Sequence, residues 1–159
     1  MSDKKRVLII CTGNSARSQM AEGLLRHNGG SKFEVESAGV APSSVRPEAI
    51  EAMREIGIDI SGQRSKSVDE FVGQNFDFII TVCDNANESC PVFSGQATRI
   101  HQSFGDPPAE TVGDYESRLE IFRRVRDEIR DWLKEFTSDD NSEFAEWDEA
   151  NLSSFDESE

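Results

Sequence analysis

The sequence has few of the features that mark membrane, secreted or nucleic-acid-binding proteins. Its 159 residues contain no long apolar run and no secretory segment at the start, so we expect neither a membrane protein nor an exported one. It has only 3 cysteines, and this odd number suits a reducing compartment such as the cytoplasm better than a disulfide framework. Lysine and arginine total 17 against 31 acidic residues, and the net charge of −14 disfavours nucleic-acid binding through a basic face.

The negative charge is concentrated near the end of the sequence. Residues 139–159 include nine acidic side chains and no lysine or arginine, so the preceding residues carry only about −5. We expect residues 138–159 to be a disordered acidic tail, and residues 1–137 to form one domain with a full core. The alternative for the tail, which contains Phe144 and Trp147, is a short amphipathic segment that docks on this protein or on a partner.

Strand-like and helix-like segments alternate through the domain. Short apolar or alternating segments predict strands over residues 7–10, 33–38, 77–82 and 98–101. Helical periodicity, caps and end signals predict helices over residues 19–26, 47–55, 67–72 and 115–136. This order predicts an α/β fold, with an open parallel four-stranded sheet flanked by helices on both faces. The apolar stripe of the last helix is interpreted as core packing and not as a cofactor site.

Cys11 stands where the first predicted strand ends and a short loop leads into a helix. The loop consists of small residues, which are Thr12, Gly13, Asn14, Ser15 and Ala16. Amide N–H groups that converge at the N-terminus of a helix attract anions. We therefore expect this loop to hold a tetrahedral oxyanion directly above the Cys11 sulfur.

The residues around Cys11 suit such a site individually. Gly13 lets the backbone approach a ligand, and Asn14 tolerates the left-handed conformation that convergent amides need. Arg17 offers a planar fork to two oxygens of the anion, and Ser18 is placed to donate a hydrogen bond to the sulfur. The amides and Arg17 should also favour the thiolate of Cys11. The alternative is that Cys11 is a small apolar residue that merely ends a strand.

The other two cysteines suggest redox chemistry. Cys83, like Cys11, lies just beyond a predicted strand, at the sheet edge where α/β proteins bind ligands. Cys90 follows too far from Cys83 for a usual zinc pair, and His27 and His101, assigned to the surface or to packing, do not complete a site. We expect no bound metal. Three thiols near one oxyanion pocket favour a redox relay, and two unrelated structural cysteines are the alternative.

Residues 11–23 resemble the signature of thiol–disulfide arsenate reductases, which share a fold with low-molecular-weight protein tyrosine phosphatases. The likeness covers about residues 5–136. Cys83 and Cys90 fit the reductase branch, whose thioredoxin-linked members carry such a pair. The phosphatase branch has aromatic residues after its Asp-Pro acid, whereas Pro108 and Ala109 follow here, which favours a small inorganic substrate.

The resemblance implies a mechanism for arsenic detoxification. Cys11 attacks arsenate held by the loop and Arg17, and Asp106 acts as general acid. Cys83 then attacks Cys11 and releases arsenite, Cys90 takes over the disulfide, and thioredoxin reduces it. Phosphate or sulfate would occupy the same loop. We expect a monomer without a cofactor, and a polar, exposed and mobile segment from Cys83 to Cys90.

Two alternatives and one secondary site remain open. The first alternative to a reductase is a phosphatase in which Cys83 and Cys90 give redox protection. The second alternative is a non-catalytic oxyanion-binding or redox-sensing module. In some relatives, residues corresponding to Glu22 and Ser37 help to form a cation site. Lys66 stands where another carboxylate lies in those relatives, so an ammonium group is expected to replace the ion.

Overall fold

Strand β1 (Lys5–Cys11) is an interior strand of a four-stranded parallel sheet. The computed structural model describes residues 4–84, 97–105, 107–109 and 111–140, of which 138–140 are described by their backbone alone. The sheet has the order β2-β1-β3-β4, and its other strands are β2 (Phe33–Gly39), β3 (Phe78–Thr81) and β4 (Thr98–His101). Residues 7–10 expose no surface, as expected for a strand of a parallel sheet with both faces covered.

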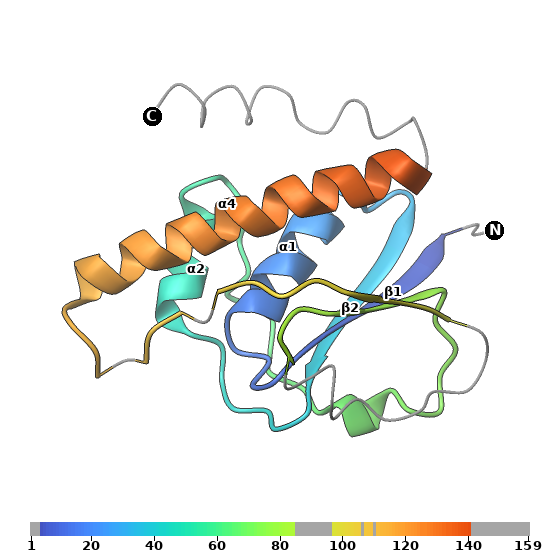
Figure 1. The fold of residues 1–159 in the computed structure, drawn as a ribbon, viewed down its shortest axis with the longest axis horizontal. Helices are drawn as coiled ribbons and strands as arrows, with labels where there is room; N and C mark the ends of the chain where they lie inside the picture. Colours follow the sequence, from blue (N-terminus) through green and yellow to red (C-terminus); the bar gives the residue numbers. More distant parts are fainter. Residues whose placement is uncertain (1–3, 85–96, 106, 110, 141–159) are drawn as a thin grey trace.

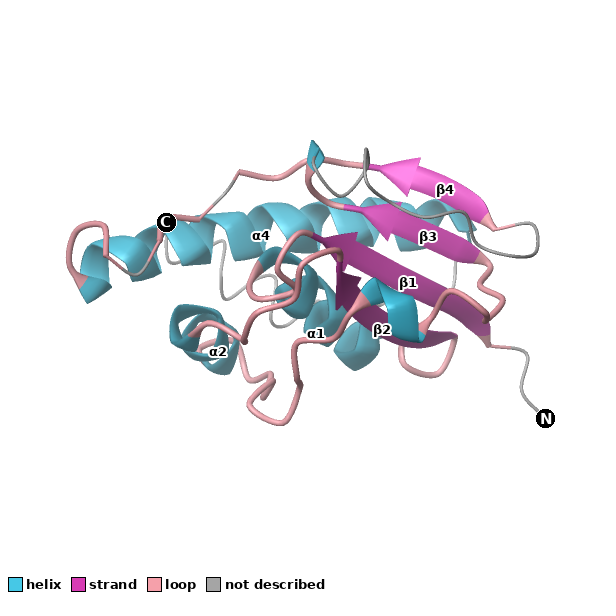
Figure 2. Ribbon diagram, turned by 90° about the horizontal axis from the view of Figure 1, so that it is seen from below, coloured by secondary structure: helices cyan, strands magenta, loops and turns pink. Residues whose placement is uncertain are grey.

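The register brings the ends of the strands to one edge of the sheet. Cys11 pairs with Gly39, Ile10 pairs with Thr81, and Thr81 pairs with His101. All four strands are parallel, so the loops that follow them gather at this edge (Figure 2). The sheet therefore places the segments after Cys11 and Thr81 beside each other, where α/β proteins bind ligands.

Helices flank the sheet on both sides. Helices α1 (Arg17–Gly29) and α4 (Tyr115–Asp140) pack against each other on one side, and α2 (Pro47–Arg54) packs against both. The short 3-10 helix η1 (Val68–Glu70) lies on the opposite side of the sheet (Figure 1). The open parallel four-stranded sheet expected from the sequence is confirmed.

The helix boundaries follow the signals in the sequence. Pro47 begins α2, where its missing N–H costs no hydrogen bond, and Gly57 adopts a positive φ of 84° after that helix ends. Ser67 accepts a hydrogen bond from the Asp69 amide and caps η1. The segment predicted as a helix over residues 67–72 is therefore only a 3-10 turn, because its backbone hydrogen bonds span three residues.

The apolar stripe of α4 forms part of the core, as predicted. Its buried members are Leu119, Phe122, Val125, Ile129 and Leu133. Burying a side chain of this size stabilises the fold by about 1.5–3 kcal/mol. Phe136 is partly buried and packs in ring contacts with Phe33, Phe78 and Trp132. The stripe thus joins the last helix to the sheet.

Helix α4 continues to Asp140, past the predicted end of the domain at residue 137. Residues 141–159 lie outside the described part of the chain, so the predicted disorder of the tail stays a prediction. Within the described ranges, no helix is both long enough and apolar enough to cross a membrane.

Candidate active site

The loop after β1 directs its amide groups to one side. The carbonyl oxygens of Cys11, Thr12, Gly13 and Ser15 accept hydrogen bonds from backbone amides of residues 40–46, and that of Asn14 accepts one from Gln19 Nε2. Because a peptide unit is planar and trans, the N–H of each following residue points away from that partner. These outward carbonyls leave the loop amides directed inward, which is the arrangement expected for an oxyanion site.

Two backbone features shape this loop. Asn14 has a φ of 49°, the left-handed conformation that the sequence predicted for it. Gly39 lies against the loop from β2, and a Cβ at this position would stand 2.6 Å from the Thr12 carbonyl oxygen and 2.9 Å from the Asn14 nitrogen. Only glycine therefore lets the strand approach this closely.

Cys11 and Cys83 lie together beneath the loop. Both are free thiols, with residue exposures of 3% and 6%. Their side chains are hydrogen-bonded to each other, and Thr12 Oγ1 lies 3.2 Å from Cys83 Sγ. The structure therefore brings the two predicted reactive thiols into contact. Cys83 is buried, so the expectation of an exposed segment is wrong at its first residue, because the end of β3 places Cys83 under Thr12.

The pKa of Cys11 is raised, contrary to the expectation of a thiolate. The hydrogen bond with Cys83 is the largest cause and burial is the second. The Arg17 guanidinium and the Thr12 amide lower the pKa, as the sequence predicted, but they do not outweigh the other two causes. Cys11 is therefore protonated in this arrangement, and it must lose its proton to react as a nucleophile.

Arg17 connects the loop to a distant segment. Its Nη1 donates a hydrogen bond to the Phe104 carbonyl oxygen over 3.1 Å. Phe104 in turn packs its ring edge-on against Trp132 of α4, with centroids 6.3 Å apart. The chain two residues after Phe104 carries Asp106, which lies outside the described residues, as does Cys90. The predicted general acid thus belongs to a segment whose start is bonded to Arg17.

A buried polar network supports the loop from below. Asn14 Nδ2 donates to Ser18 Oγ (2.8 Å) and to Ser37 Oγ (2.9 Å), and Ser37 Oγ donates to Glu22 Oε1 (2.5 Å). The Lys66 amide donates to Asn14 Oδ1 over 2.7 Å. These bonds hold Asn14 in its unusual conformation. The hydrogen bond from Ser18 to the Cys11 sulfur stays a prediction.

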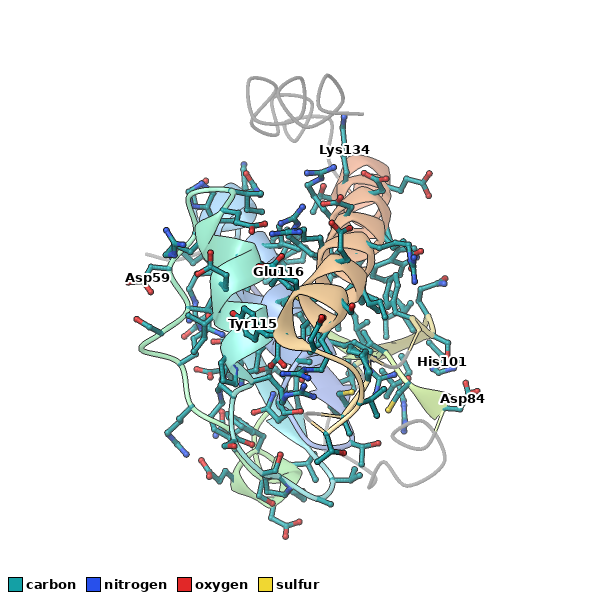
Figure 3. All side chains as sticks on the ribbon, turned by 90° about the vertical axis from the view of Figure 1, so that its left-hand side faces the viewer. Asp59, Asp84, His101, Tyr115, Glu116 and Lys134 are labelled. Carbon is teal, nitrogen blue, oxygen red and sulfur yellow. The ribbon has the colours of Figure 1, made fainter. Side chains whose placement is uncertain are left out.

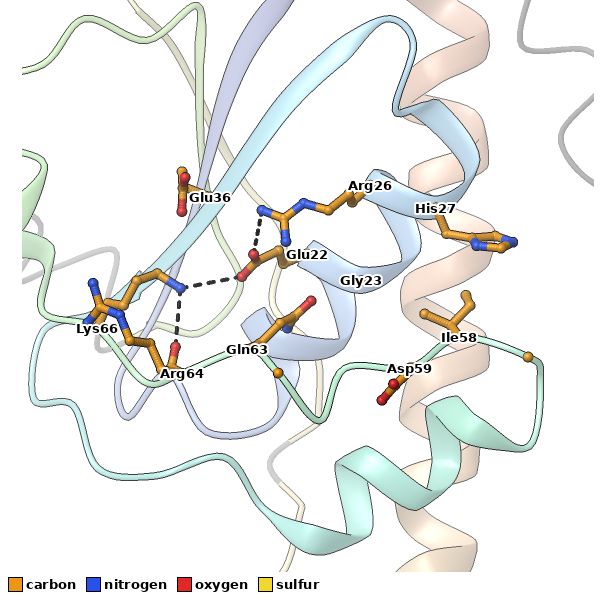
Figure 4. A pocket seen from close by; sticks show the side chains of 12 residues that line it. Glu22, Gly23, Arg26, His27, Glu36, Ile58, Asp59, Gln63, Arg64 and Lys66 are labelled. Atoms are coloured by element: carbon orange, nitrogen blue, oxygen red, sulfur yellow. Dashed lines mark hydrogen bonds and ion pairs between the residues drawn. The ribbon is translucent and has the colours of Figure 1, made fainter.

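Glu22 is neutralised by two cations (Figure 4). Lys66 Nζ lies 3.6 Å from Glu22 Oε1, and Arg26 Nη2 lies 2.6 Å from Glu22 Oε2. The ammonium group thus stands beside Glu22, as the sequence predicted. Among the residues that the structure describes, no three histidine, cysteine or acidic side chains are grouped to hold a metal ion.

Glu22 and Lys66, two members of this network, also line a pocket. This pocket has a volume of about 570 Å³, and Figure 4 shows its charged lining, which includes Glu22, Arg26, Glu36, Arg64 and Lys66. It contains neither Cys11 nor Cys83. Its charges are mixed in sign, and Glu22, Arg26 and Lys66 already pair with one another. The lining of this pocket is therefore not that of the predicted oxyanion site.

Three contacts at this edge have no signal in the sequence. They are Thr12 with Cys83, Arg17 with Phe104, and Asp84 with His101. Their members are 71, 87 and 17 residues apart, and only the pairing of the strands brings them together. Thr12 and Arg17 were named from the loop, but their partners were not predicted.

Comparisons with known proteins agree with this geometry. The family model of low molecular weight phosphotyrosine protein phosphatases matches residues 6–145. The chain is 44% identical to an arsenate reductase of Halalkalibacterium halodurans and 42% identical to one of Bacillus subtilis. Each match covers 84% of this chain and 96% of the relative.

Among solved structures, an arsenate reductase in the intermediate state has a TM-score of 0.69 and 34% identity, over 86% of this chain and 99% of that one. The low molecular weight protein tyrosine phosphatase of T. tengcongensis has a TM-score of 0.67 and 26% identity, with the same coverage. The chain therefore belongs to the low molecular weight phosphotyrosine protein phosphatase family.

Proposed function

We propose that this protein is an arsenate reductase that converts arsenate to arsenite by thiol–disulfide chemistry. One observation carries the proposal, namely the contact between two buried free thiols, Cys11 and Cys83, beneath a loop built for an oxyanion. Hydrolysis of a phosphoester needs one nucleophile, whereas reduction needs a second thiol to complete the electron transfer. The relatives of 42–44% identity that are named arsenate reductases support the same conclusion.

The substrate binds in the Cys11 loop. The inward amides of residues 12–16 and the Arg17 guanidinium supply hydrogen bonds and positive charge to a tetrahedral oxyanion. A solved arsenate reductase in a phosphate-binding state, 33% identical, supports oxyanion binding in this fold. Phosphate or sulfate is expected to compete with arsenate here, because all three are tetrahedral anions of similar charge.

The first step forms a bond between the Cys11 sulfur and arsenic. Cys11 loses its proton, its sulfur attacks arsenate, and one oxygen leaves after protonation by Asp106 as general acid. Arg17 and the Thr12 amide favour the required thiolate. The bond between Arg17 and Phe104 supports the role of Asp106, because it brings the segment before Asp106 to the loop.

The second step transfers the electrons. The Cys83 sulfur, as a thiolate, attacks the Cys11 sulfur and forms a Cys11–Cys83 disulfide. The bond between sulfur and arsenic breaks, and its electron pair stays on arsenic, which leaves as arsenite. Two thiols are thereby oxidised to a disulfide while arsenic is reduced by two electrons.

Regeneration uses the third cysteine. Cys90 attacks Cys83, frees Cys11 and moves the disulfide to Cys83–Cys90, which thioredoxin reduces by further thiol–disulfide exchange. The need to keep these thiols reduced supports a cytoplasmic location. We expect a monomer that needs no resident cofactor, because the electrons come from thiols.

A phosphatase is the second candidate, favoured by one observation. The tyrosine phosphatase of T. tengcongensis has a similar fold, with a TM-score of 0.67 and 26% identity to this chain. A phosphatase would use Cys11, Arg17 and Asp106 in the same way but would not need Cys83 for turnover. A non-catalytic oxyanion-binding or redox-sensing module is the third possibility, and it predicts neither activity.

One coupled assay separates the three functions. NADPH oxidation through thioredoxin reductase and thioredoxin is followed with and without arsenate, and hydrolysis of p-nitrophenyl phosphate is measured in parallel. We expect arsenate-dependent NADPH oxidation in the native protein and none in Cys83→Ser. Phosphoester hydrolysis that survives in Cys83→Ser, without arsenate turnover in the native protein, would identify a phosphatase. Absence of both activities would identify a binding module.

A further inference from the structure

Asp84, the residue that follows Cys83, is bound by two side chains from the neighbouring strand and its extension. His101 Nε2 lies 2.9 Å from Asp84 Oδ1, and Ser103 Oγ donates to the same oxygen over 2.8 Å. Figure 3 shows Asp84 and His101 side by side at the edge of the molecule. Cys83 is therefore followed directly by a residue that is tied to the chain after β4.

The tie continues into the sheet. His101 Nδ1 lies 2.8 Å from Thr81 Oγ1, and these two residues are register partners at the ends of β3 and β4. Backbone bonds extend this pairing, because the Gln102 amide donates to the Thr81 carbonyl and the Phe104 amide to the Val82 carbonyl. The imidazole thus bridges the last residue of β3 and the first residue after Cys83.

The protonation states follow from the partners. An ionised carboxylate only accepts hydrogen bonds, so His101 Nε2 must carry a proton and donate to Asp84. Hydrogen bonds from Ser103 and His101 lower the pKa of Asp84, which keeps it ionised and able to accept. Nδ1, the other ring nitrogen, faces the Thr81 hydroxyl.

This pair adds little to the stability of the fold. The Asp84 side chain is 80% exposed and that of His101 is 31% exposed. Ion pairs between exposed side chains typically contribute about 0–1 kcal/mol. However, His101 bonds to Thr81 and Asp84, and these two residues stand on either side of Cys83 in the chain. The bonds therefore affect where Cys83 lies far more than whether the domain folds.

We propose that His101, acting through Asp84, is a positioning residue that holds Cys83 against Cys11; this rests on the function proposed above and deepens it. A disulfide forms only within narrow limits of distance and dihedral angle. Cys83 is held from the β1 side by Thr12, and from the β4 side by the His101–Asp84 pair. Loss of the second tie widens the range of positions of the Cys83 sulfur and lowers the frequency of productive attack on Cys11. Arsenate binding, which uses the loop and Arg17, stays as it is.

Two substitutions of His101 separate positioning from bulk packing. Glutamine carries an amide that reaches about as far as Nε2, so His101→Gln keeps a donor for Asp84. Asparagine reaches only about as far as Nδ1, so His101→Asn loses that donor.

The assay uses a Cys90→Ser background. This background leaves Cys11 and Cys83 as the only thiols, so one disulfide alone can form within a chain. Its formation after a single turnover with arsenate is measured by rapid alkylation and mass spectrometry.

We expect His101→Asn to form the Cys11–Cys83 disulfide about tenfold more slowly, since small displacements of reacting groups cost one to two powers of ten in rate. His101→Gln should stay within about twofold of the parent, and Asp84→Ala should match His101→Asn, with no further loss in the double variant. The arsenate concentration for half-maximal rate should be unchanged in all of them. His27→Gln, at the other histidine, is the matched control.

Three results would overturn the proposal. They are a parental rate in His101→Asn, an equal loss in His101→Gln, or a loss explained entirely by weaker arsenate binding. Oxidation by diamide, which takes up the two thiol hydrogens without arsenate, tests the positioning of Cys83 independently. If arsenate produces no disulfide in any variant, the proposed function fails. The positioning role still stands in that case if diamide separates His101→Asn from His101→Gln, and it falls if diamide does not.

Discussion

Thr12 Oγ1 lies 3.2 Å from Cys83 Sγ, so a side chain of the oxyanion loop contacts the second thiol directly. Thr12 follows Cys11 in the chain, and its amide donates to the Cys11 sulfur. One residue therefore contacts both sulfurs, the first through its backbone and the second through its hydroxyl. In the proposed mechanism, this residue therefore links the loop that binds the substrate to the thiol that completes the electron transfer.

Thr12→Val should separate these two tasks. Valine keeps the backbone amide and the shape of the side chain but loses the hydroxyl that contacts Cys83. We expect disulfide formation after a single arsenate turnover to slow about three- to tenfold, which corresponds to one hydrogen bond of about 1 kcal/mol. Hydrolysis of p-nitrophenyl phosphate, if present, should be unchanged. Thr12→Ser restores the hydroxyl and should restore the rate; failure of this rescue would contradict a role for the hydrogen bond.

Removal of Cys83 should lower the pKa of Cys11. The hydrogen bond with Cys83 is the largest cause that raises this pKa, and its loss leaves Arg17 and the Thr12 amide to favour the thiolate. Cys83→Ala in a Cys90→Ser background should therefore show Cys11 alkylation by iodoacetamide at lower pH than Cys90→Ser alone, with only the Cys11 adduct scored. A pH profile that stays in place or moves upward would contradict the assigned cause.

Lys66→Met should destabilise the protein. It removes one of two cations from Glu22, whose side chain is only 3% exposed, and the remaining partner is Arg26. Breaking a buried pair costs up to 3–5 kcal/mol, and with Arg26 still present we expect a loss of about 2 kcal/mol in the free energy of unfolding. Urea denaturation at neutral pH measures this value. Glu22→Gln added to Lys66→Met removes the buried carboxylate that has lost one of its two cations, and it should recover part of the loss.

Gly39→Ala should weaken oxyanion binding. The added Cβ would stand 2.6 Å from the Thr12 carbonyl oxygen and 2.9 Å from the Asn14 nitrogen, and both atoms belong to backbone that cannot rotate away. We expect the loop to shift, the stability to fall by about 1–3 kcal/mol and phosphate to bind at least about tenfold more weakly. Gly73→Ala is the control, because nothing lies within 4 Å of its added Cβ. Isothermal titration with phosphate compares the two, and equal affinities would contradict the close approach.

Much of the fold was predictable because it depends on local patterns. The strand predicted over residues 7–10 is a short apolar run within β1 (Lys5–Cys11). The helix predicted over residues 47–55 begins with proline and stops before glycine, and α2 spans Pro47–Arg54. The apolar stripe of the last helix predicted its buried side correctly. The segment over residues 67–72 was predicted as a helix and is a shorter 3-10 turn, because a cap and one polar turn do not reveal how many hydrogen bonds follow.

The site likewise has features that local sequence predicts and contacts that only the folded sheet creates. The sequence alone predicted the strand, loop and helix around Cys11, because a strand, five small residues and a helix that begins at Arg17 are neighbours in the chain. It also placed Cys11 and Cys83 at one sheet edge, because parallel strands end together. It misjudged the protonation of Cys11, since it revealed Arg17 and the loop amides but neither the burial of the sulfur nor its bond to Cys83. The contacts of Cys83 with Thr12 and of Asp84 with His101 exist only in the folded sheet. They depend on the order and register of strands that are far apart in the chain, and no local pattern encodes that pairing.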